Sequence, residues 1–302
     1  MFLSYAGGFA ETVTDLADYE RAGLDIVFVP EAYSFDAVSQ LGFIAAKTER
    51  VQIASGIFQL YSRTPALTAM TAAGLDYVSG GRFTLGLGAS GPQVIEGWHG
   101  VPYDAPIGRA REIIEICRMM WKREKVEHTG IYNLPLPEGQ GTGLGKALKL
   151  INHPIREHIP IYVAAIGNKN VEMTAEIADG WIPLYYSPFR QDVYSEHLAG
   201  AKEGFEIPAL ANITVTDDIE AGLLPVKMML GFYLGGMGAK STNFHVDLLN
   251  RMGFEHVTGK IQELFFAGKR AEAVAAIPDE MADEIALCGS DARIRDRLSA
   301  WR

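Results

Sequence analysis

The sequence contains few cysteines and no long apolar run, and these absences exclude several classes of protein. Among 302 residues only Cys117 and Cys288 are cysteines, which leaves no disulfide framework and no zinc-binding spacing. No apolar run approaches the roughly 18 residues of a membrane helix, and the N-terminus does not resemble a signal peptide. We therefore expect a soluble protein of the reducing cytoplasm.

Several common catalytic and metal-binding motifs are also missing. The seven histidines show no metal-ligand spacing, and the chain has no H-E-x-x-H, G-x-S-x-G or P-loop motif. The formal net charge is −10, and the acidic residues are scattered, which argues against binding to nucleic acid or to an anionic membrane. We expect no metal site, no nucleic-acid partner and no membrane partner, and a small molecule as substrate.

What the sequence does contain is an alternation of short apolar segments with longer helical patterns. The apolar segments lack polar alternation, as expected of parallel strands that are covered on both faces. Cys117 lies in an amphipathic pattern and is expected to be a buried apolar residue. The predicted strands are 2–5, 25–30, 51–57, 82–88, 159–167, 180–184 and 209–216. The predicted helices are 11–22, 35–48, 65–79, 107–122, 168–178 and 188–203, and most of the chain after 216 is expected to be helical.

This alternation predicts an α/β fold, namely a TIM (β/α)8 barrel formed by residues 1–302 as a single domain. Residues 124–158 are rich in Gly and Pro, so we expect an insertion after the fourth helix. Seven strands are predicted, and an eighth would follow the helix at 290–302, where this chain stops; the eighth strand is thus expected to be absent from this chain. An open doubly wound sheet is the alternative that periodicity leaves open.

The segment GLGASG, residues 86–91, matches the G-x-G-x-x-G fingerprint of dinucleotide-binding folds. That fingerprint requires a long helix directly after the glycines and belongs to the first strand–helix–strand unit. Here Pro92 follows, Gly97 and Gly100 limit any helix to about two turns, and the preceding strand is the fourth. We therefore reject a Rossmann fold. In a barrel, small residues at the carboxyl end of a strand let backbone amides approach an anion.

Four segments carry a resemblance to a known family: ASGIFQLYSRTPALTAMTAAGLDYVSGGRFTLGLGASGP (54–92), DIVFVPEAYSFDA (25–37), IPIYVAAIGNKNVEMTAEIADGWIP (159–183) and CGSDARIRDRLSAWR (288–302). They resemble the bacterial luciferase-like superfamily of flavin and deazaflavin enzymes. The most similar branch is the coenzyme F420-dependent one, related to methylenetetrahydromethanopterin reductase. The resemblance implies a TIM barrel with an insertion and an oxidoreductase that transfers a hydride between coenzyme F420 and an organic substrate.

The resemblance also implies where the cofactor binds. Residues 56–57 take the position of a non-prolyl cis peptide that bulges under the central ring, and residues 90–93 that of a loop against the cofactor's tail. Residues 167–170 open the helix after the fifth strand, where amides, the helix dipole and a lysine favour phosphate, although a plain helix cap is the alternative. The expected cofactor-binding residues are Gly56, Ile57, Ser90, Gly91, Pro92, Gln93, Gly167, Asn168, Lys169 and Asn170.

Three carboxylates are the candidate catalytic residues. Glu31 and Asp36 lie at and after the end of the second strand, where they could orient the ring or donate a proton, or equally cap the helix that begins near residue 34. Glu96 is the third candidate. No proton donor carries over from the family, because this chain has Ala32 where some relatives have histidine, and residues 91–92 are Gly-Pro where others have an acid.

Two other functions stay open at this point. One is an FMN-dependent luciferase-like monooxygenase, which would need a flavin reductase as partner, and the other is a non-catalytic flavin-binding barrel. The resemblance further implies a homodimer formed through helices beside the insertion. Aromatic side chains in predicted loops at the carboxyl ends of strands could form an apolar substrate wall or pack as satellites of the core: Tyr33, Phe35, Tyr61, Trp98 and Tyr103.

Overall fold

The computed structural model describes residues 1–3, 8–237 and 243–301, and these fall into two compact units. The first unit comprises Met1–Ala164, Met173–Ile182 and Lys202–Glu206. The second comprises Ala165–Glu172, Pro183–Ala201 and Ile207–Arg302. The expectation that residues 1–302 form one domain stays a prediction.

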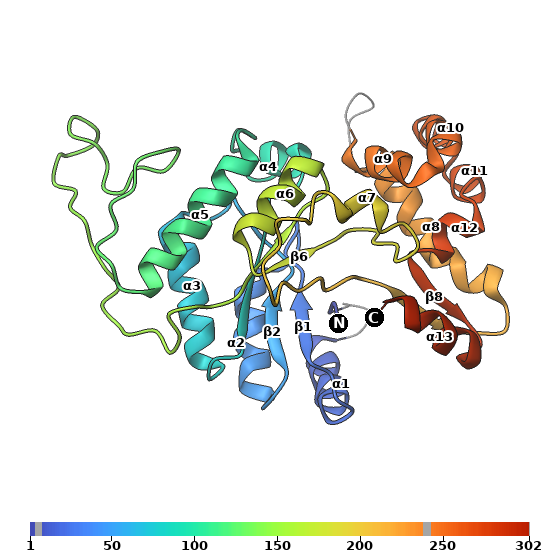
Figure 1. Cartoon of the computed structure of the whole chain (residues 1–302), viewed down its shortest axis with the longest axis horizontal. Coiled ribbons are helices and arrows are strands. Elements are labelled where there is room, and N and C mark those ends of the chain that lie inside the picture. Colours follow the sequence, from blue (N-terminus) through green and yellow to red (C-terminus); the bar gives the residue numbers. More distant parts are fainter. Residues whose placement is uncertain (4–7, 238–242, 302) are drawn as a thin grey trace. The chain divides into compact units, whose positions relative to one another are not determined.

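The first unit is built on a parallel sheet, as the alternation predicted (Figure 1). The strand order is β1-β2-β4-β5-β6, and β3 pairs with β4 beyond the end of β2. The chain thus has an α/β fold with a parallel sheet. The strands are β1 (Ile26–Val29), β2 (Gln52–Ser55), β3 (Phe58–Gln59), β4 (Phe83–Gly88), β5 (Ile161–Ala164) and β6 (Gly180–Ile182).

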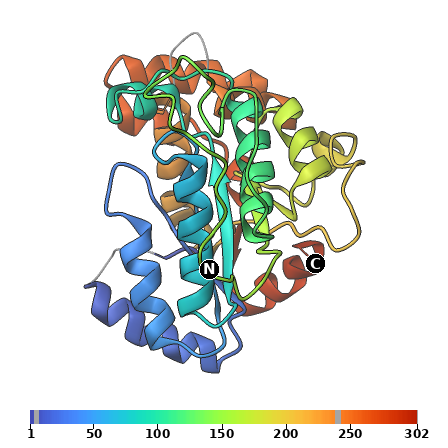
Figure 2. The ribbon, with the colours of Figure 1, turned by 90° about the vertical axis from the view of Figure 1, so that its left-hand side faces the viewer.

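Helices follow most of these strands and cover the outer face of the sheet. Helix α3 packs between α2 and α5, and the indole Nε1 of Trp121 in α5 donates a hydrogen bond to the carbonyl of Ala69 in α3 at 3.0 Å (Figure 2). Pro65 begins α3 where its missing N–H costs no hydrogen bond. The helices are α1 (Phe9–Arg21), α2 (Ala37–Lys47), α3 (Pro65–Val78), α4 (Pro92–Gly97) and α5 (Pro106–Trp121), and the first unit also includes the end of α6 (Asn168–Ile177) from Met173 onward.

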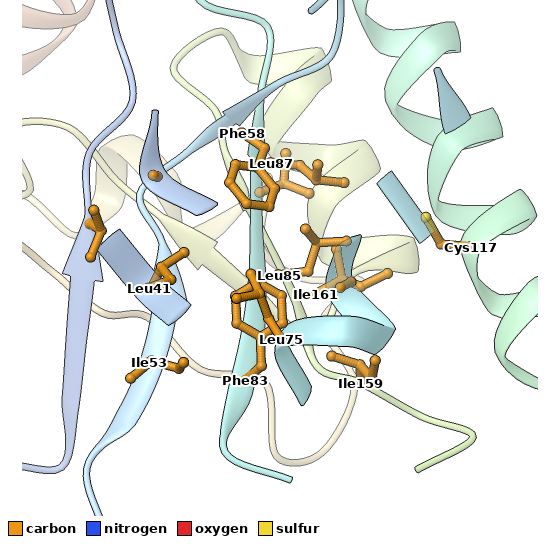
Figure 3. Close-up of a cluster of buried hydrophobic side chains, with 14 of the residues drawn as sticks. Leu41, Ile53, Phe58, Leu75, Phe83, Leu85, Leu87, Cys117, Ile159 and Ile161 are labelled. Carbon is orange, nitrogen blue, oxygen red and sulfur yellow. The ribbon is translucent and has the colours of Figure 1, made fainter. Parts of the chain in front are cut away.

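Side chains of the sheet alternate between an outer and an inner face, as the period of two in a strand requires. Outward residues pack with the helices in a large core, part of which is drawn in Figure 3 together with the buried Cys117 of α5. Burial raises the pKa of the Cys117 thiol, so the thiol stays uncharged, as expected of a buried apolar residue. The inner face carries a smaller cluster formed by Phe28, Ala54, Tyr162 and Ile182, with Phe2, Ile26, Ile57 and Ala164 against it.

The second unit contains a two-stranded parallel sheet and mostly helices. Strand β7 (Asn212–Val215) pairs with β8 (Ala286–Gly289). None of the helices in the described part of the chain is both long and apolar enough to cross a membrane. The helical elements are α7 (Asp192–Ser195), α8 (Ile219–Gly235), α9 (Phe244–Leu249), η1 (Asn250–Phe254), α10 (Glu255–Phe266), α11 (Arg270–Ala275), α12 (Asp279–Asp283), α13 (Asp291–Leu298) and η2 (Ser299–Trp301).

Three local expectations differ from the structure. The helix expected at 188–203 is only the four residues of α7, which turns follow at 196–200. Strand β8 lies in a region expected to be helical. Of the strand expected at 2–5, Phe2 forms a bridge to Phe28, and residues 4–7 lie outside the described part.

The segment expected to be an insertion, 124–158, contains no helix or strand. An antiparallel bridge joins His128 and Leu134, and the segment belongs to the first unit. The expected absence of an eighth strand from this chain is not confirmed, because residues 286–289 form a strand, β8, that was not among the seven predicted.

One glycine of the GLGASG segment is required by the packing of β2 against β4. A Cβ on Gly86 would lie 1.8 Å from the carbonyl oxygen of Ser55. The Ser55 hydroxyl bridges the same residue, accepting from the Gly86 N–H and donating to its carbonyl, each at 2.9 Å. Between β2 and β3 the register against β4 shifts by one residue, which is the mark of a bulge.

We predict that Gly86→Ala lowers the free energy of unfolding by at least about 3 kcal/mol, because its methyl group must displace a buried backbone carbonyl. Gly42→Ala is the control, since Gly42 lies inside α2 with nothing within 4 Å of its added Cβ. That change should stabilise the protein by about 0.5–1 kcal/mol. Chemical denaturation of both variants measures this, and equal stabilities would contradict the account.

Candidate functional site

The bulge between β2 and β3 projects onto the inner face at the carboxyl end of the sheet. The Gly56–Ile57 peptide bond is cis, as the resemblance implied. A Cβ on Gly88 would lie 3.0 Å from the Ile57 side chain and 3.3 Å from the Cβ of Ala164. A Cβ on Gly56 would lie 2.8 Å from the Phe2 ring. The bulge therefore lies over Gly88, which has no side chain. Ile57 is the side chain that the bulge itself presents on the inner face of the sheet.

A buried ion pair stands beside the bulge. Both Arg63 nitrogens Nη1 and Nη2 donate to the Glu31 carboxylate, the second at 2.9 Å, and both side chains are nearly buried. Glu31 also accepts from the backbone N–H of Ala37 at 2.8 Å. The Arg63 guanidinium lies 4.2 Å from the centre of the Phe58 ring. The catalytic assignment of Glu31 stays a prediction, and the contacts describe a carboxylate engaged in holding the start of α2.

Asp36 caps helix α2, which is the alternative that the sequence left open. Its carboxylate accepts from the Ser39 N–H at 2.9 Å and from the Ser39 hydroxyl at 2.8 Å. The hydrogen bond from the Ser39 N–H is the main reason why the pKa of Asp36 lies below its ordinary value. Asp36 is therefore ionised near neutral pH, which suits a helix cap better than a proton donor.

The loop 90–93 links β4 to α4. Ser90 has φ +59°, a left-handed conformation that is uncommon outside glycine and often found at functional sites. Tyr103 donates its hydroxyl to the Ser90 carbonyl at 3.4 Å, and its own N–H donates to Glu96 at 3.2 Å. Gly91 precedes α4, which has only six residues, so the short helix predicted after GLGASG is confirmed.

The other predicted loop, 167–170, lies in the second unit. The Gly167 carbonyl accepts the first helical hydrogen bonds of α6, from Asn170 at 2.9 Å and Val171 at 3.0 Å. Arg251 donates to the side chain of Asn168 and, at 2.9 Å, to the carbonyl of Ile166. Lys169 is exposed. The phosphate-binding role of these residues, alone or together with 90–93, stays a prediction.

Aromatic side chains gather at the carboxyl end of the first unit. Tyr33 packs against Trp98 with ring centres 6.4 Å apart, and Tyr61 stacks on Tyr103 at 5.2 Å. Tyr33, Trp98 and Phe35 are at least half exposed. A cavity of about 250 Å³ opens beside them, lined by Leu60, Tyr61, Ser62, Arg63, Thr64, Val101, Arg109 and Tyr132.

A larger cavity, about 610 Å³, lies at the amino ends of the strands and is lined mainly by charged side chains. Most of these are already paired: Arg82 donates to three backbone carbonyls around the end of α2, and His158 and Lys202 both contact Asp179. In α/β proteins with parallel strands the functional face is the carboxyl end of the sheet. No group of three or more metal-ligating side chains occurs among the described residues.

Sequence reasoning missed three residues of this region: Ser55, Gln59 and Arg63. Ser55 supports the bulge, Arg63 holds Glu31, and Gln59 is buried at 2% exposure on β3. The available signal was polarity, because Ser55 and Gln59 are polar residues within an otherwise apolar segment. The inward orientation of these residues could not be predicted from the alternation along the strand, since the bulge changes which residues face inward.

We predict that Asp36→Ala lowers the free energy of unfolding by about 1 kcal/mol at neutral pH, as loss of a helix cap does. Because the folded pKa of Asp36 is lowered, its contribution is present above the pKa of the unfolded chain and is lost as the pH falls through the folded pKa. The difference should therefore shrink in acid. Asp36→Asn, which keeps the cap, is the control. Loss of turnover with unchanged stability would instead identify Asp36 as catalytic.

Comparisons with known proteins identify the family and agree with the α/β fold. The family described as luciferase-like monooxygenase matches residues 2–302. A Mycobacterium tuberculosis protein named as a coenzyme F420-dependent oxidoreductase, Rv3520c, is 45% identical over 95% of this chain and 86% of its own length. The 5,10-methylenetetrahydromethanopterin reductase of Archaeoglobus fulgidus is 26% identical over 93% of this chain and 82% of its own.

A solved structure shares the fold. The coenzyme F420-dependent tetrahydromethanopterin reductase of Methanopyrus kandleri superimposes with a TM-score of 0.79 over 99% of this chain and 88% of that one, at 20% identity. These matches confirm the predicted resemblance to the coenzyme F420-dependent branch. The chain belongs to the luciferase-like monooxygenase family.

Proposed function

We propose that this protein is a coenzyme F420-dependent oxidoreductase that transfers a hydride between the deazaflavin and an organic substrate. The observation that carries the proposal is the inward bulge at Ser55–Ile57, which lies over Gly86 and Gly88 at the carboxyl end of the sheet. The 45% identical relative that is named for this cofactor supports the same assignment. We place the enzyme in the cytoplasm and its sheet in an eight-stranded barrel with an insertion at 124–158.

The residues of the first unit fit a flat, partly apolar ring. Ile57 offers an apolar surface on the bulge, and the bare glycines beneath leave no side chain that could push the bulge outward. A buried, unpaired amide oxygen on Gln59 and the left-handed loop at Ser90 lie at the same end of the strands. When bound, a deazaflavin supplies hydride chemistry, so the protein contributes binding, orientation and exclusion of water. Residues 167–170 are proposed to hold its phosphate.

The substrate class follows from the side chains around this end of the sheet. Exposed aromatic rings at Tyr33, Phe35 and Trp98 favour an organic molecule with an apolar or planar part. The Arg109 guanidinium in the 250 Å³ cavity is paired with Asp104 and lies over the Tyr61 ring at 5.2 Å. A methylenetetrahydromethanopterin-like substrate is one candidate, and no described side chain selects a pterin over other molecules of this class.

Two other functions are compatible with the same surface. One is an FMN-dependent monooxygenase, in line with the family's description as luciferase-like monooxygenase. Such an enzyme would use a flavin of similar shape and would need a flavin reductase. A flavin-binding barrel without turnover is the other.

The experiment is a fluorescence titration of the apoprotein with oxidised coenzyme F420 and, in parallel, with FMN. We expect Kd for coenzyme F420 to be at least about tenfold lower than Kd for FMN, a difference of about 1.4 kcal/mol. The reverse order would favour the monooxygenase. Tight binding without reduction of any organic substrate would favour the non-catalytic protein, and binding of neither compound would contradict all three.

We also propose that the protein is a homodimer, with no nucleic-acid or membrane partner, and that helix α3 lies in the interface. Asp76 is the only charged residue of α3, and it is buried in an ion pair with Arg156, so α3 presents no charge to solvent. Helices that are apolar on every side are normally covered. A two-fold axis brings a residue against its own copy, which suits an uncharged face. The exposed apolar residues are Leu67, Met70, Tyr77 and Val78 on α3 and Leu144, Leu148 and Ile151 in the expected insertion.

We predict that Met70→Glu converts the dimer to a monomer at micromolar concentration, because it buries a like-charged pair in the interface. Met228→Glu is the matched control, since Met228 is an equally exposed methionine on α8. Sedimentation velocity measures the result. A monomeric wild type, or dissociation by the control alone, would contradict the assignment of α3.

A further inference from the structure

We propose that Gln59 binds the ring edge of the deazaflavin, its Oε1 accepting a hydrogen bond from an N–H group there. This inference rests on the proposed function and adds a residue that neither the sequence nor the family resemblance identified. It begins from an unpaired atom: Gln59 is 2% exposed, and its Oε1 is buried without a hydrogen-bond partner.

The identity of the unpaired atom follows from the neighbouring groups. The other end of the Gln59 amide lies 3.3 Å from the backbone carbonyl of Glu31. A carbonyl only accepts, so the amide nitrogen must face it and the oxygen must be the atom left over. A buried acceptor without a partner costs roughly 1–3 kcal/mol and calls for a functional explanation or a bound molecule.

The position of Gln59 on the sheet directs it to the proposed cofactor face. Its neighbours Phe58 and Leu60 belong to the outer core, so alternation along the strand turns Gln59 to the inner face. Ile57, two residues earlier, is on that inner face. Gln59 also pairs in register with Gly88, the glycine over which the bulge lies. One inward surface at the carboxyl end thus carries an apolar residue and a polar acceptor side by side.

The chemistry of a flavin-like ring matches this pair of groups. Its face is apolar and suits Ile57, while its pyrimidine edge carries an N–H donor between carbonyl groups. An amide oxygen fixed by a neighbouring hydrogen bond is pre-organised to accept from that donor, which reduces the entropy lost on binding. Glu31 acts through Gln59 as a positioning residue, because its carbonyl holds the amide nitrogen and Arg63 holds its carboxylate.

Gln59→Met tests the proposal by two measurements, the stability of the apoprotein and its affinity for the cofactor. The variant removes the unpaired acceptor and also the 3.3 Å hydrogen bond to the Glu31 carbonyl, two changes of opposite sign, so thermal stability of the apoprotein should change little. It also leaves the ring N–H without a partner, so Kd for coenzyme F420 should rise about tenfold. A merely structural glutamine would instead show lower stability and unchanged affinity. Gln59→Glu keeps an acceptor oxygen and should recover part of the affinity.

Gln40 provides a matched control on α2. Its amide also donates to a backbone carbonyl, that of Asp36 at 2.9 Å, and its Oε1 is likewise buried and unpaired. Gln40→Met should leave Kd unchanged. If wild type binds coenzyme F420 and Gln59→Met binds it equally well, the role of Gln59 is wrong while the proposed function stands. If Gln40→Met weakens coenzyme F420 binding as much as Gln59→Met does, the role of Gln59 is also wrong. If wild type does not bind coenzyme F420, the proposed function itself fails.

Discussion

The Ser55 carbonyl oxygen occupies the space in which any residue other than glycine at position 86 would carry its Cβ. That contact lets the strand after Ser55 cross onto the inner face, while the Ser55 hydroxyl replaces the ladder hydrogen bonds that the crossing disrupts. The register shift then turns Ile57 and Gln59 inward and leaves Phe58 in the outer core. The arrangement of the candidate site therefore depends on two residues without side-chain bulk, Gly86 and Gly88, in β4.

The charged groups around this surface mainly support it. Glu31 is held by Arg63, Asp36 caps α2, and Glu96 accepts from the backbone of Tyr103, which in turn contacts Ser90. Such contacts fix the loops at the carboxyl end in place, which is what a cofactor enzyme requires of its protein part. The catalytic roles expected of Glu31, Asp36 and Glu96 stay predictions.

Much of the first unit could be predicted from the sequence, because β1, β2, β4 and β5 are apolar runs and α2, α3 and α5 have clear starts. The short helix after GLGASG followed from Pro92 and Gly97. The glycines themselves were interpreted as residues that let backbone amides approach an anion, whereas Gly86 makes room for the Ser55 carbonyl. What could not be predicted depends on contacts between distant segments. Examples are the Arg63–Glu31 pair, the inward orientation of Gln59 and strand β8. The four residues of β8 are too few to show a periodic pattern in the sequence.

The most direct test of the account is a crystal structure of the protein soaked with or grown in coenzyme F420. The account predicts that the ring density lies against Ile57 on the inner face, with its pyrimidine edge within hydrogen-bond distance of Gln59 Oε1. A ring bound elsewhere, for example in the charged cavity at the amino ends of the strands, would contradict the claim that the bulge over Gly86 and Gly88 forms the cofactor site.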